Sequence, residues 1–202
     1  MASLRETQKQ MTRRLLLDSG LELFKAKGYA ATTIDDIATA AGTTRVTFYA
    51  YFPSRGALMK AIIDGPLNEA LERVRSPEHG STAQDLVAAV ADGGREAIEA
   101  WLRRVSENWP VIYPIIRIAR DAAAVEPELA HLIERWLEEP ISDIEDGLTK
   151  AGRLKPYQRH FRGVLAMAEL DYVAQNWSRS DWKLTREQML DELAASWTRL
   201  LS

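Results

Sequence analysis

The sequence of 202 residues contains no cysteine, which excludes disulfides and every metal or redox site that depends on a thiolate. It also lacks a long apolar run. The longest, residues 111–116, is interrupted by Pro114 and ends at Arg117, well short of the ~20 residues that a membrane-spanning helix needs. The polar opening MASLRETQKQ has no apolar segment of the kind found in secretory signals. Together these features predict a soluble, cytoplasmic protein.

The residue patterns of catalytic sites are missing as well. His79, His131 and His160 are scattered, and none is paired with a second histidine at metal-ligand spacing. There is no GxSxG, no phosphate-binding loop and no GxGxxG, and the pair Gly93-Gly94 is too short to indicate a nucleotide site. We therefore expect a protein that is not an enzyme and that uses no metal or cofactor.

Positive charge is concentrated near the N-terminus, although the whole chain has a formal net charge of -3. Residues 1–60 contain nine Lys and Arg against five Asp and Glu, whereas the remaining 142 residues contain seventeen against twenty-four. A basic segment on an acidic body is typical of a protein that presents one end to nucleic acid. Chance clustering is the alternative that this count alone leaves open.

Residues 33–52, TIDDIATAAGTTRVTFYAYF, have the pattern of two short helices joined by a tight turn. Apolar residues of the first helix recur at three- and four-residue spacing, which places them on one face: Ile34, Ile37, Ala38 and Ala41. Thr33 is expected to cap this helix, Gly42 to end it, and Thr44 to cap the second helix.

The second helix begins with polar residues and ends with aromatic ones. Arg45 and Thr47 occupy early outward positions, whereas Phe48 and Phe52, four residues apart, are expected to face inward. Two short helices, a glycine turn and an arginine at the start of the second helix describe a helix-turn-helix, whose second helix lies in the major groove of DNA.

The segment GYAATTIDDIATAAGTTRVTFYAYFPSRGALMKAII resembles the DNA-binding signature of TetR-family (tetracycline-repressor-like) transcriptional regulators. The matching pieces are Gly28-Tyr29, Thr32-Thr33-Ile34, Asp36-Ile37-Ala38, Ala41-Gly42, Phe48-Tyr49, Tyr51-Phe52 and Ser54-Arg55. The departures from the usual pattern concern base contacts rather than the fold, and they are Gly20, Thr43, Val46 and Ala50.

This resemblance implies an all-α protein with two domains. The first is an N-terminal three-helix helix-turn-helix DNA-binding domain, residues 1–52, and the second is a helical ligand-binding and dimerisation domain, residues 53–202.

The candidates for base recognition are Thr44, Arg45, Val46 and Thr47. An arginine can pair bidentately with guanine, and the methyl group of valine or threonine can pack on the methyl group of thymine. The candidates for phosphate contacts, through hydroxyls, helix N-termini and one guanidinium, are Thr33, Tyr49, Tyr51 and Arg55. For Tyr51, packing at a hinge is an equal alternative.

The rest of the chain has helical patterns and no alternating strand pattern. The expected helices are residues 6–27, 54–76, 83–108, 111–124, 128–151, 157–178 and 185–200, of which 83–108 is either one helix weakened at a glycine pair or two pieces. Gly20 is expected to let another helix approach closely. Gly65-Pro66 predicts a kink, because proline removes a backbone donor and clashes with the preceding turn. A loop is expected at residues 76–82.

The helix expected at residues 157–178 is apolar around much of its circumference. Such a helix is buried on most sides, which indicates contact with its own core on one side and with a second subunit on the other. It resembles the family's penultimate helix, which implies a homodimer held by a four-helix interface together with residues 185–200. A central core helix in a monomer is the alternative.

The resemblance also implies a small-molecule effector in an apolar, aromatic-lined chamber of the body. The candidate ligand-binding residues are Trp101, Trp109, Tyr113, Trp136, Met167, Glu169, Tyr172 and Asn176. Glu169 and Asn176, seven residues apart, share one face of an otherwise apolar helix and could hydrogen-bond a ligand. Ordinary core or dimer packing is the alternative for each aromatic residue.

Taken together, the sequence predicts a homodimeric transcriptional repressor. It would bind a pseudo-palindromic, double-stranded DNA operator and be released by a small, largely apolar effector. A helical small-molecule-binding module without DNA-binding activity is the first alternative, and an enzyme on a helical scaffold is the second.

Overall fold

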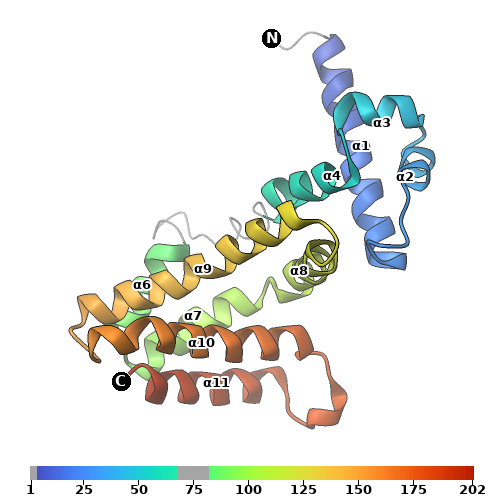
Figure 1. The fold of residues 1–202 in the computed structure, drawn as a ribbon. Coiled ribbons are helices and arrows are strands. Elements are labelled where there is room, and N and C mark those ends of the chain that lie inside the picture. Colours follow the sequence, from blue (N-terminus) through green and yellow to red (C-terminus); the bar gives the residue numbers. More distant parts are fainter. Residues whose placement is uncertain (1–3, 68–81) are drawn as a thin grey trace. The chain divides into compact units, whose positions relative to one another are not determined.

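The structure, a computed structural model, describes residues 4–67 and 82–202, and these ranges contain helices and no strand (Figure 1). The all-α class is therefore confirmed. The elements are α1 (Leu4–Lys27), α2 (Ile34–Ala40), α3 (Arg45–Tyr51), α4 (Arg55–Ile62), the π-helical turn η1 (Ile63–Leu67), α6 (Thr82–Asp92), α7 (Arg95–Ser106), α8 (Trp109–Ala123), α9 (Pro127–Lys150), α10 (Pro156–Asn176), the 3-10 turn η2 (Ser180–Trp182) and α11 (Arg186–Leu200).

Contacts between residues divide the chain into two compact units. The first comprises residues 1–69 and 114–133, and the second comprises residues 70–113 and 134–202. Helices α8 and α9 therefore each run from one unit into the other. A functional division of the chain at residue 52 stays a prediction.

In the first unit, α1 packs against α2 and α4 through Leu16 and Phe24, which are fully buried. A Cβ atom added to Gly20 would lie 2.7 Å from Leu58 Cδ2 of α4, so the glycine admits the close approach that the sequence predicted. Gly28 ends α1 with a φ of +83°, a backbone conformation that glycine adopts without strain.

The two helices of the motif begin and end as predicted. Thr33 caps α2 in a capping box with Asp36, and Thr44 caps α3 by accepting a hydrogen bond from the backbone N–H of Thr47. Phe48 and Phe52 are buried, with ring centroids 5.9 Å apart. Their burial fixes α3 against the unit's core and leaves its opposite face outward.

The helix that follows α3 loses its regular geometry where the sequence predicted a kink. Ser54 caps α4 through the N–H of Ala57, and the α-helix ends at Ile62. Residues 63–67, which include Gly65, continue as a π-helical turn. The predicted continuation to residue 76, and most of the loop predicted at 76–82, lie outside the described residues.

The second unit is built around a shared apolar core from α6, α7, the start of α8, α9, α10 and α11. Trp101 of α7 and Trp197 of α11 stack at its centre, with ring centroids 5.6 Å apart. Residues 83–108, for which the sequence left open one weakened helix or two pieces, form two helices, because Gly93 adopts a φ of +73° after α6. Arg153 lies over this break and donates hydrogen bonds to the carbonyl groups of Val90 and Ala91.

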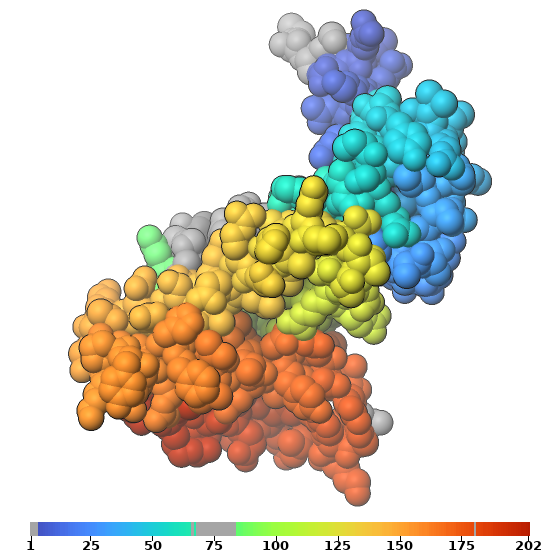
Figure 2. All heavy atoms as spheres, in the orientation of Figure 1, coloured from blue at the N-terminus to red at the C-terminus, as the bar shows by residue number. Residues whose placement is uncertain are grey.

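Within the chain, helix α10 is buried on one side, as predicted for the side that faces its own core, and burial of the other side by a second subunit stays a prediction. Its inner side carries Gly163, Ala166, Leu170 and Ala174, all buried. Its outer side exposes Phe161, Leu165 and Tyr172, which are spaced as one helical stripe. The space-filling view shows α10, in orange, forming part of the molecular surface (Figure 2). On α11, which lies in the range 185–200 that the resemblance assigned to the subunit interface, Leu193 belongs to the core of its own chain.

Close backbone contacts of α9 generate a stability prediction. A Cβ atom added to Gly147 would lie 2.7 Å from Val90 Cβ and 2.9 Å from the carbonyl oxygen of Val87, both on α6. We expect Gly147→Ala to lower the free energy of unfolding by about 1–3 kcal/mol, because the clash exceeds the gain in helix propensity. Urea denaturation measures this. Gly65→Ala is the matched control, since its Cβ would meet nothing within 4 Å, and an equal change in both variants would contradict the prediction.

Candidate functional site

The outward face of α3 combines one cation, one apolar side chain and one aromatic hydroxyl. Arg45, Val46 and Tyr49 are exposed, and Val46 is 81% exposed although it is apolar. Burial of Phe48 on the other side of the short helix sets this orientation. The structure therefore brings together two of the four predicted base readers, Arg45 and Val46, beside the predicted phosphate contact Tyr49.

Arg45 is held in place by two neighbours. Its Nη1 donates to Asp35 Oδ2 at 2.9 Å, and its Nη2 donates to the Tyr49 hydroxyl at 3.3 Å, with the guanidinium 5.6 Å from the centroid of the Tyr49 ring. The hydrogen bond with Tyr49 and then the charge of Asp35 raise the pKa of Arg45 above its ordinary value. The side chain is therefore a permanent, exposed cation that leans towards α2.

The three threonines among the predicted DNA contacts are engaged in helix caps. The hydroxyls of Thr44 and Thr47 lie 3.0 Å apart. The Thr33 hydroxyl donates to Asp36 Oδ2 at 2.6 Å, and Lys27 Nζ lies 2.7 Å from the same oxygen. The hydrogen bond from Lys27 and then those from Thr33 hold the pKa of Asp36 well below its usual range. These hydroxyls fix the helix starts, and their contacts with DNA stay a prediction.

Arg55 has a structural role that the sequence analysis did not identify. Its Nη1 donates to the carbonyl groups of Tyr29 at 3.0 Å and Thr32 at 2.6 Å, and its guanidinium lies 4.1 Å from the centroid of the Tyr29 ring. These contacts tie the first turn of α4 to the segment between α1 and α2. A phosphate contact by Arg55, like one by the half-buried Tyr51, stays a prediction.

The hydroxyl of Tyr29 also contacts the turn between α8 and α9. The buried Tyr29 donates its hydroxyl to Glu126 Oε1 at 2.9 Å. A Cβ atom added to Gly56 would lie 3.3 Å from the carboxylate of Glu126. The absence of a side chain at Gly56 therefore lets this carboxylate pack closely against the first turn of α4. Tyr29, Arg55 and Glu126, which we call the Tyr29 cluster, therefore join three segments of the first unit. No sequence pattern links residues 97 positions apart.

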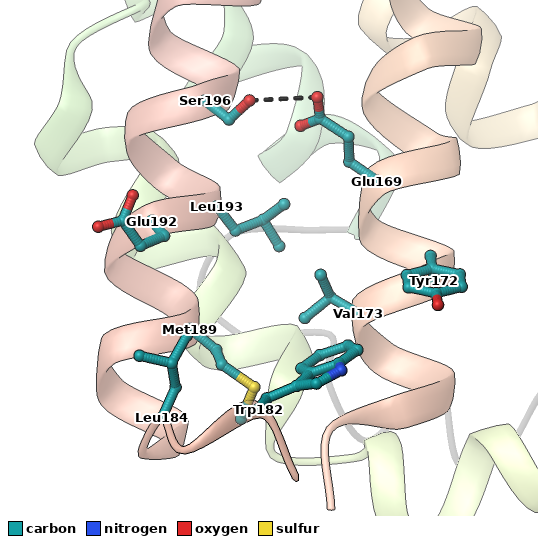
Figure 3. Close-up of a pocket in the computed structure, with 9 residues that line it drawn as sticks. All are labelled: Glu169, Tyr172, Val173, Trp182, Leu184, Met189, Glu192, Leu193 and Ser196. Atoms are coloured by element: carbon teal, nitrogen blue, oxygen red, sulfur yellow. Dashed lines mark hydrogen bonds between the residues drawn. The ribbon is translucent and has the colours of Figure 1, made fainter. Parts of the chain in front are cut away.

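A cavity of about 320 Å³ lies between α10 and the segment from η2 to α11, in the second unit. Its lining residues are Glu169, Tyr172, Val173, Trp182, Leu184, Met189, Glu192, Leu193 and Ser196. Figure 3 shows Glu169 and Ser196 at one end, Trp182 and Met189 at the other, and the side chains of Val173 and Leu193 between them. The cavity thus has a polar end and an apolar length.

The structure separates the eight predicted effector residues into several environments. Glu169 and Tyr172 line the cavity. Trp101 and Trp109 are buried in the core, and Tyr113 and Met167 pack against it. Trp136 is half-buried on α9. The amide of Asn176 donates to the carbonyl of Tyr172 at 2.8 Å instead of pairing with Glu169. A role in effector binding stays a prediction for each of them.

The described part of the chain also lacks two other features. Within residues 4–67 and 82–202, no group of three or more His, Asp or Glu side chains is arranged to hold a metal ion. No helix in the same ranges is both long and apolar enough to cross a membrane.

The Tyr29 cluster generates a pH prediction. Burial, followed by the charge and hydrogen bonding of Glu126, raises the pKa of Tyr29 to about 12, against the opposing effect of Arg55. Between the unfolded value of about 10 and this folded value, only the folded state keeps the proton, so its stability falls as pH rises. We expect the free energy of unfolding of Tyr29→Phe to fall less at alkaline pH than that of the wild type, because the variant has no hydroxyl to ionise. Urea unfolding of both proteins at about pH 8 and about pH 11 measures it, and parallel losses would contradict the assignment.

Comparisons with known proteins agree with the motif. The family described as "Bacterial regulatory proteins, tetR family" matches residues 16–62. The uncharacterized HTH-type transcriptional regulator YvdT of Bacillus subtilis is 37% identical over 65 residues, 32% of this chain and 34% of YvdT. The HTH-type transcriptional regulator EthR of Mycobacterium tuberculosis is 27% identical over 129 residues, 60% of this chain and 55% of EthR. The chain thus spans about a third of the length of YvdT and about half of EthR.

Solved structures show the same fold over nearly the whole chain. The fatty acid degradation regulator FadR from Bacillus halodurans aligns with a TM-score of 0.63 at 17% identity, covering 94% of both chains. AibR, solved in complex with isovaleryl coenzyme A and operator DNA, aligns with a TM-score of 0.65 at 20% identity, covering 92% of this chain and 97% of AibR. Residues 16–62 thus carry the helix-turn-helix of the tetR family of bacterial regulatory proteins, and the chain shares the overall fold of the two solved regulators.

Proposed function

We propose that the protein is a ligand-responsive, DNA-binding regulator of transcription that acts as a repressor and is released from its operator by a small effector. The observation that carries the DNA-binding part is the outward face of α3. This face presents Arg45 and Val46 while the helix is fixed by buried aromatic residues. A cation and a methyl-bearing side chain on an exposed helix suit the edges of guanine and thymine in the major groove.

Base recognition by Arg45 requires it to exchange one partner for another. In the free protein its guanidinium is paired with Asp35, and both side chains are more than half exposed. An exposed ion pair of this kind contributes only ~0–1 kcal/mol to stability. The guanidinium can therefore leave Asp35 for a guanine edge at little cost, whereas Asp35 would oppose a placement close to phosphates.

Dimerisation is proposed on the exposed apolar stripe of α10. Phe161 is 61% exposed and Leu165 is 37% exposed, although both are apolar. A helix that exposes large apolar side chains in one stripe is stabilised when a second copy covers that stripe. Two copies related by a twofold axis would present two α3 helices to the two halves of a pseudo-palindromic operator.

Effector control is proposed to pass through the helices shared by both units. α8 and α9 have residues in the second unit, and the turn between them carries Glu126 of the Tyr29 cluster. A ligand alters DNA binding only through its different affinity for two arrangements of the protein. The solved complex of AibR with both isovaleryl coenzyme A and operator DNA supports such a mode of action by analogy of fold.

The first functional prediction concerns base readout. The preferred operator would be selected from a random DNA pool, and binding to it and to unrelated DNA would be measured by fluorescence anisotropy. We expect Arg45→Ala to weaken operator binding by ~1–3 kcal/mol and to relax the preference at one position in each half-site. Arg14→Ala, which removes another exposed arginine side chain, on α1, controls for lost charge. Equal losses on operator and unrelated DNA would show that Arg45 is not a base reader. A wild type that binds no DNA would favour a helical ligand-binding module.

The second functional prediction concerns assembly. We expect Phe161→Glu to yield monomers at micromolar concentration, because a carboxylate in a covered apolar stripe loses its hydration. Sedimentation would measure the mass, and operator binding should weaken since a single half-site supplies only part of the affinity. Val111→Glu places the same charge at an exposed apolar position of α8, 53% exposed, and should remain dimeric. A monomeric wild type would refute the proposed dimer.

A further inference from the structure

We infer that the first three turns of α1 form a second contact with DNA, in which Arg5 and Lys9 bind backbone phosphates next to the bases that α3 would read. This inference rests on the proposed function, because it assigns a further surface to the same partner. It concerns the affinity for the duplex and the position of the protein on it, since phosphates carry no base sequence.

The start of α1 extends beyond the packed part of the first unit. Every residue from Leu4 to Leu15 is exposed apart from the half-buried Thr12, and the buried core begins at Leu16. Figure 1 and Figure 2 show the first turns of α1, at the blue end of the chain, projecting from the rest of the helix-turn-helix. Roughly 16 Å of helix is therefore accessible to a partner.

The basic residues of these turns form one stripe. Arg5, Lys9 and Arg13 are spaced four residues apart, so they lie on one side of α1 at steps of about 6 Å. Residues 4–14 contain four basic side chains and one acidic side chain, Glu6. This segment is therefore a local concentration of positive charge on a chain whose formal net charge is -3.

Arg13 shows that this stripe begins at the end of α3. Its guanidinium lies 5.3 Å from the centroid of the ring of Phe52, the residue directly after α3. Lys9 and Arg5 follow one and two turns further along the same side of α1. Among the residues that the structure describes, no ion pair involves Arg5 or Lys9. Two unpaired cations beside the proposed base-reading helix suit the phosphates that adjoin those bases.

An anionic membrane is the alternative partner for a basic helix that also exposes apolar residues. Leu4, Met11 and Leu15 form an exposed apolar stripe on another side of α1. Asp18, which pairs with Arg14, adjoins this stripe and would be repelled by anionic headgroups. The contact of the basic stripe with the end of α3 therefore favours DNA.

The salt dependence of DNA binding tests the inference. Fluorescence anisotropy would compare the double variant Arg5→Gln, Lys9→Gln with the wild type from about 50 to 200 mM salt. Each phosphate contact contributes about 0.9 to the slope of log affinity against log salt, so this variant should flatten the slope by about 1.8 for each chain bound. Over this range the wild type should lose about tenfold more affinity than the variant for each chain bound.

A matched control is the double variant Arg14→Gln, Lys25→Gln, which removes two positive charges from the same helix. These side chains lie roughly 140–160° around the helix from Lys9, and each is paired with a carboxylate of α1. The control should keep the wild-type slope. The loss in the first variant should be equal on operator and on unrelated DNA, because phosphates rather than bases are bound.

The outcomes separate this inference from the proposed function. Equal slopes in the two double variants overturn the inference and leave DNA binding through α3 intact, whereas a wild type that binds no DNA overturns both. Cosedimentation with vesicles that contain phosphatidylserine tests the alternative partner. Equal slopes together with vesicle binding that is lost in the Arg5→Gln, Lys9→Gln variant would assign the stripe to a membrane.

Discussion

The packing of the Arg55 guanidinium on the ring of Tyr29 is the interaction on which the first unit depends. One planar cation covers an aromatic face, satisfies carbonyl groups of the segment between α1 and α2, and leaves the hydroxyl of the same ring for Glu126. Such a stack uses the flat geometry of a guanidinium, which lysine cannot reproduce. This contact therefore ties the first turn of α4 to the segment between α1 and α2.

The local part of the fold could be predicted from the sequence, whereas long-range contacts could not. Thr33, Thr44 and Ser54 cap helices through atoms three residues away, so their roles follow from spacing. The pairing of Tyr29 with Glu126 and of Glu169 with Ser196 depends on how helices pack, and no periodicity reports it. The stacking of Trp101 on Trp197 in the core is likewise a long-range contact that no periodicity reports.

The surface of α3 illustrates how one helix can be stable and still available for binding. Its inner side is held by two phenylalanines, and its outer side keeps a valine in water and an arginine paired with an exposed carboxylate. Burial of the inner side contributes the stability. The outer residues contribute little to folding, which leaves their identity free to be set by recognition of a partner.

Two glycines, one on α9 and one on α10, bring the backbone of α9 close to both of its neighbours. Gly147 brings its backbone against α6, and Gly163 of α10 brings α10 against the carbonyl oxygen of Ile141, where an added Cβ would lie 2.9 Å away. Helix α9 therefore cannot slide or roll past α6 or α10 without breaking the close-packed backbone contacts at both glycines.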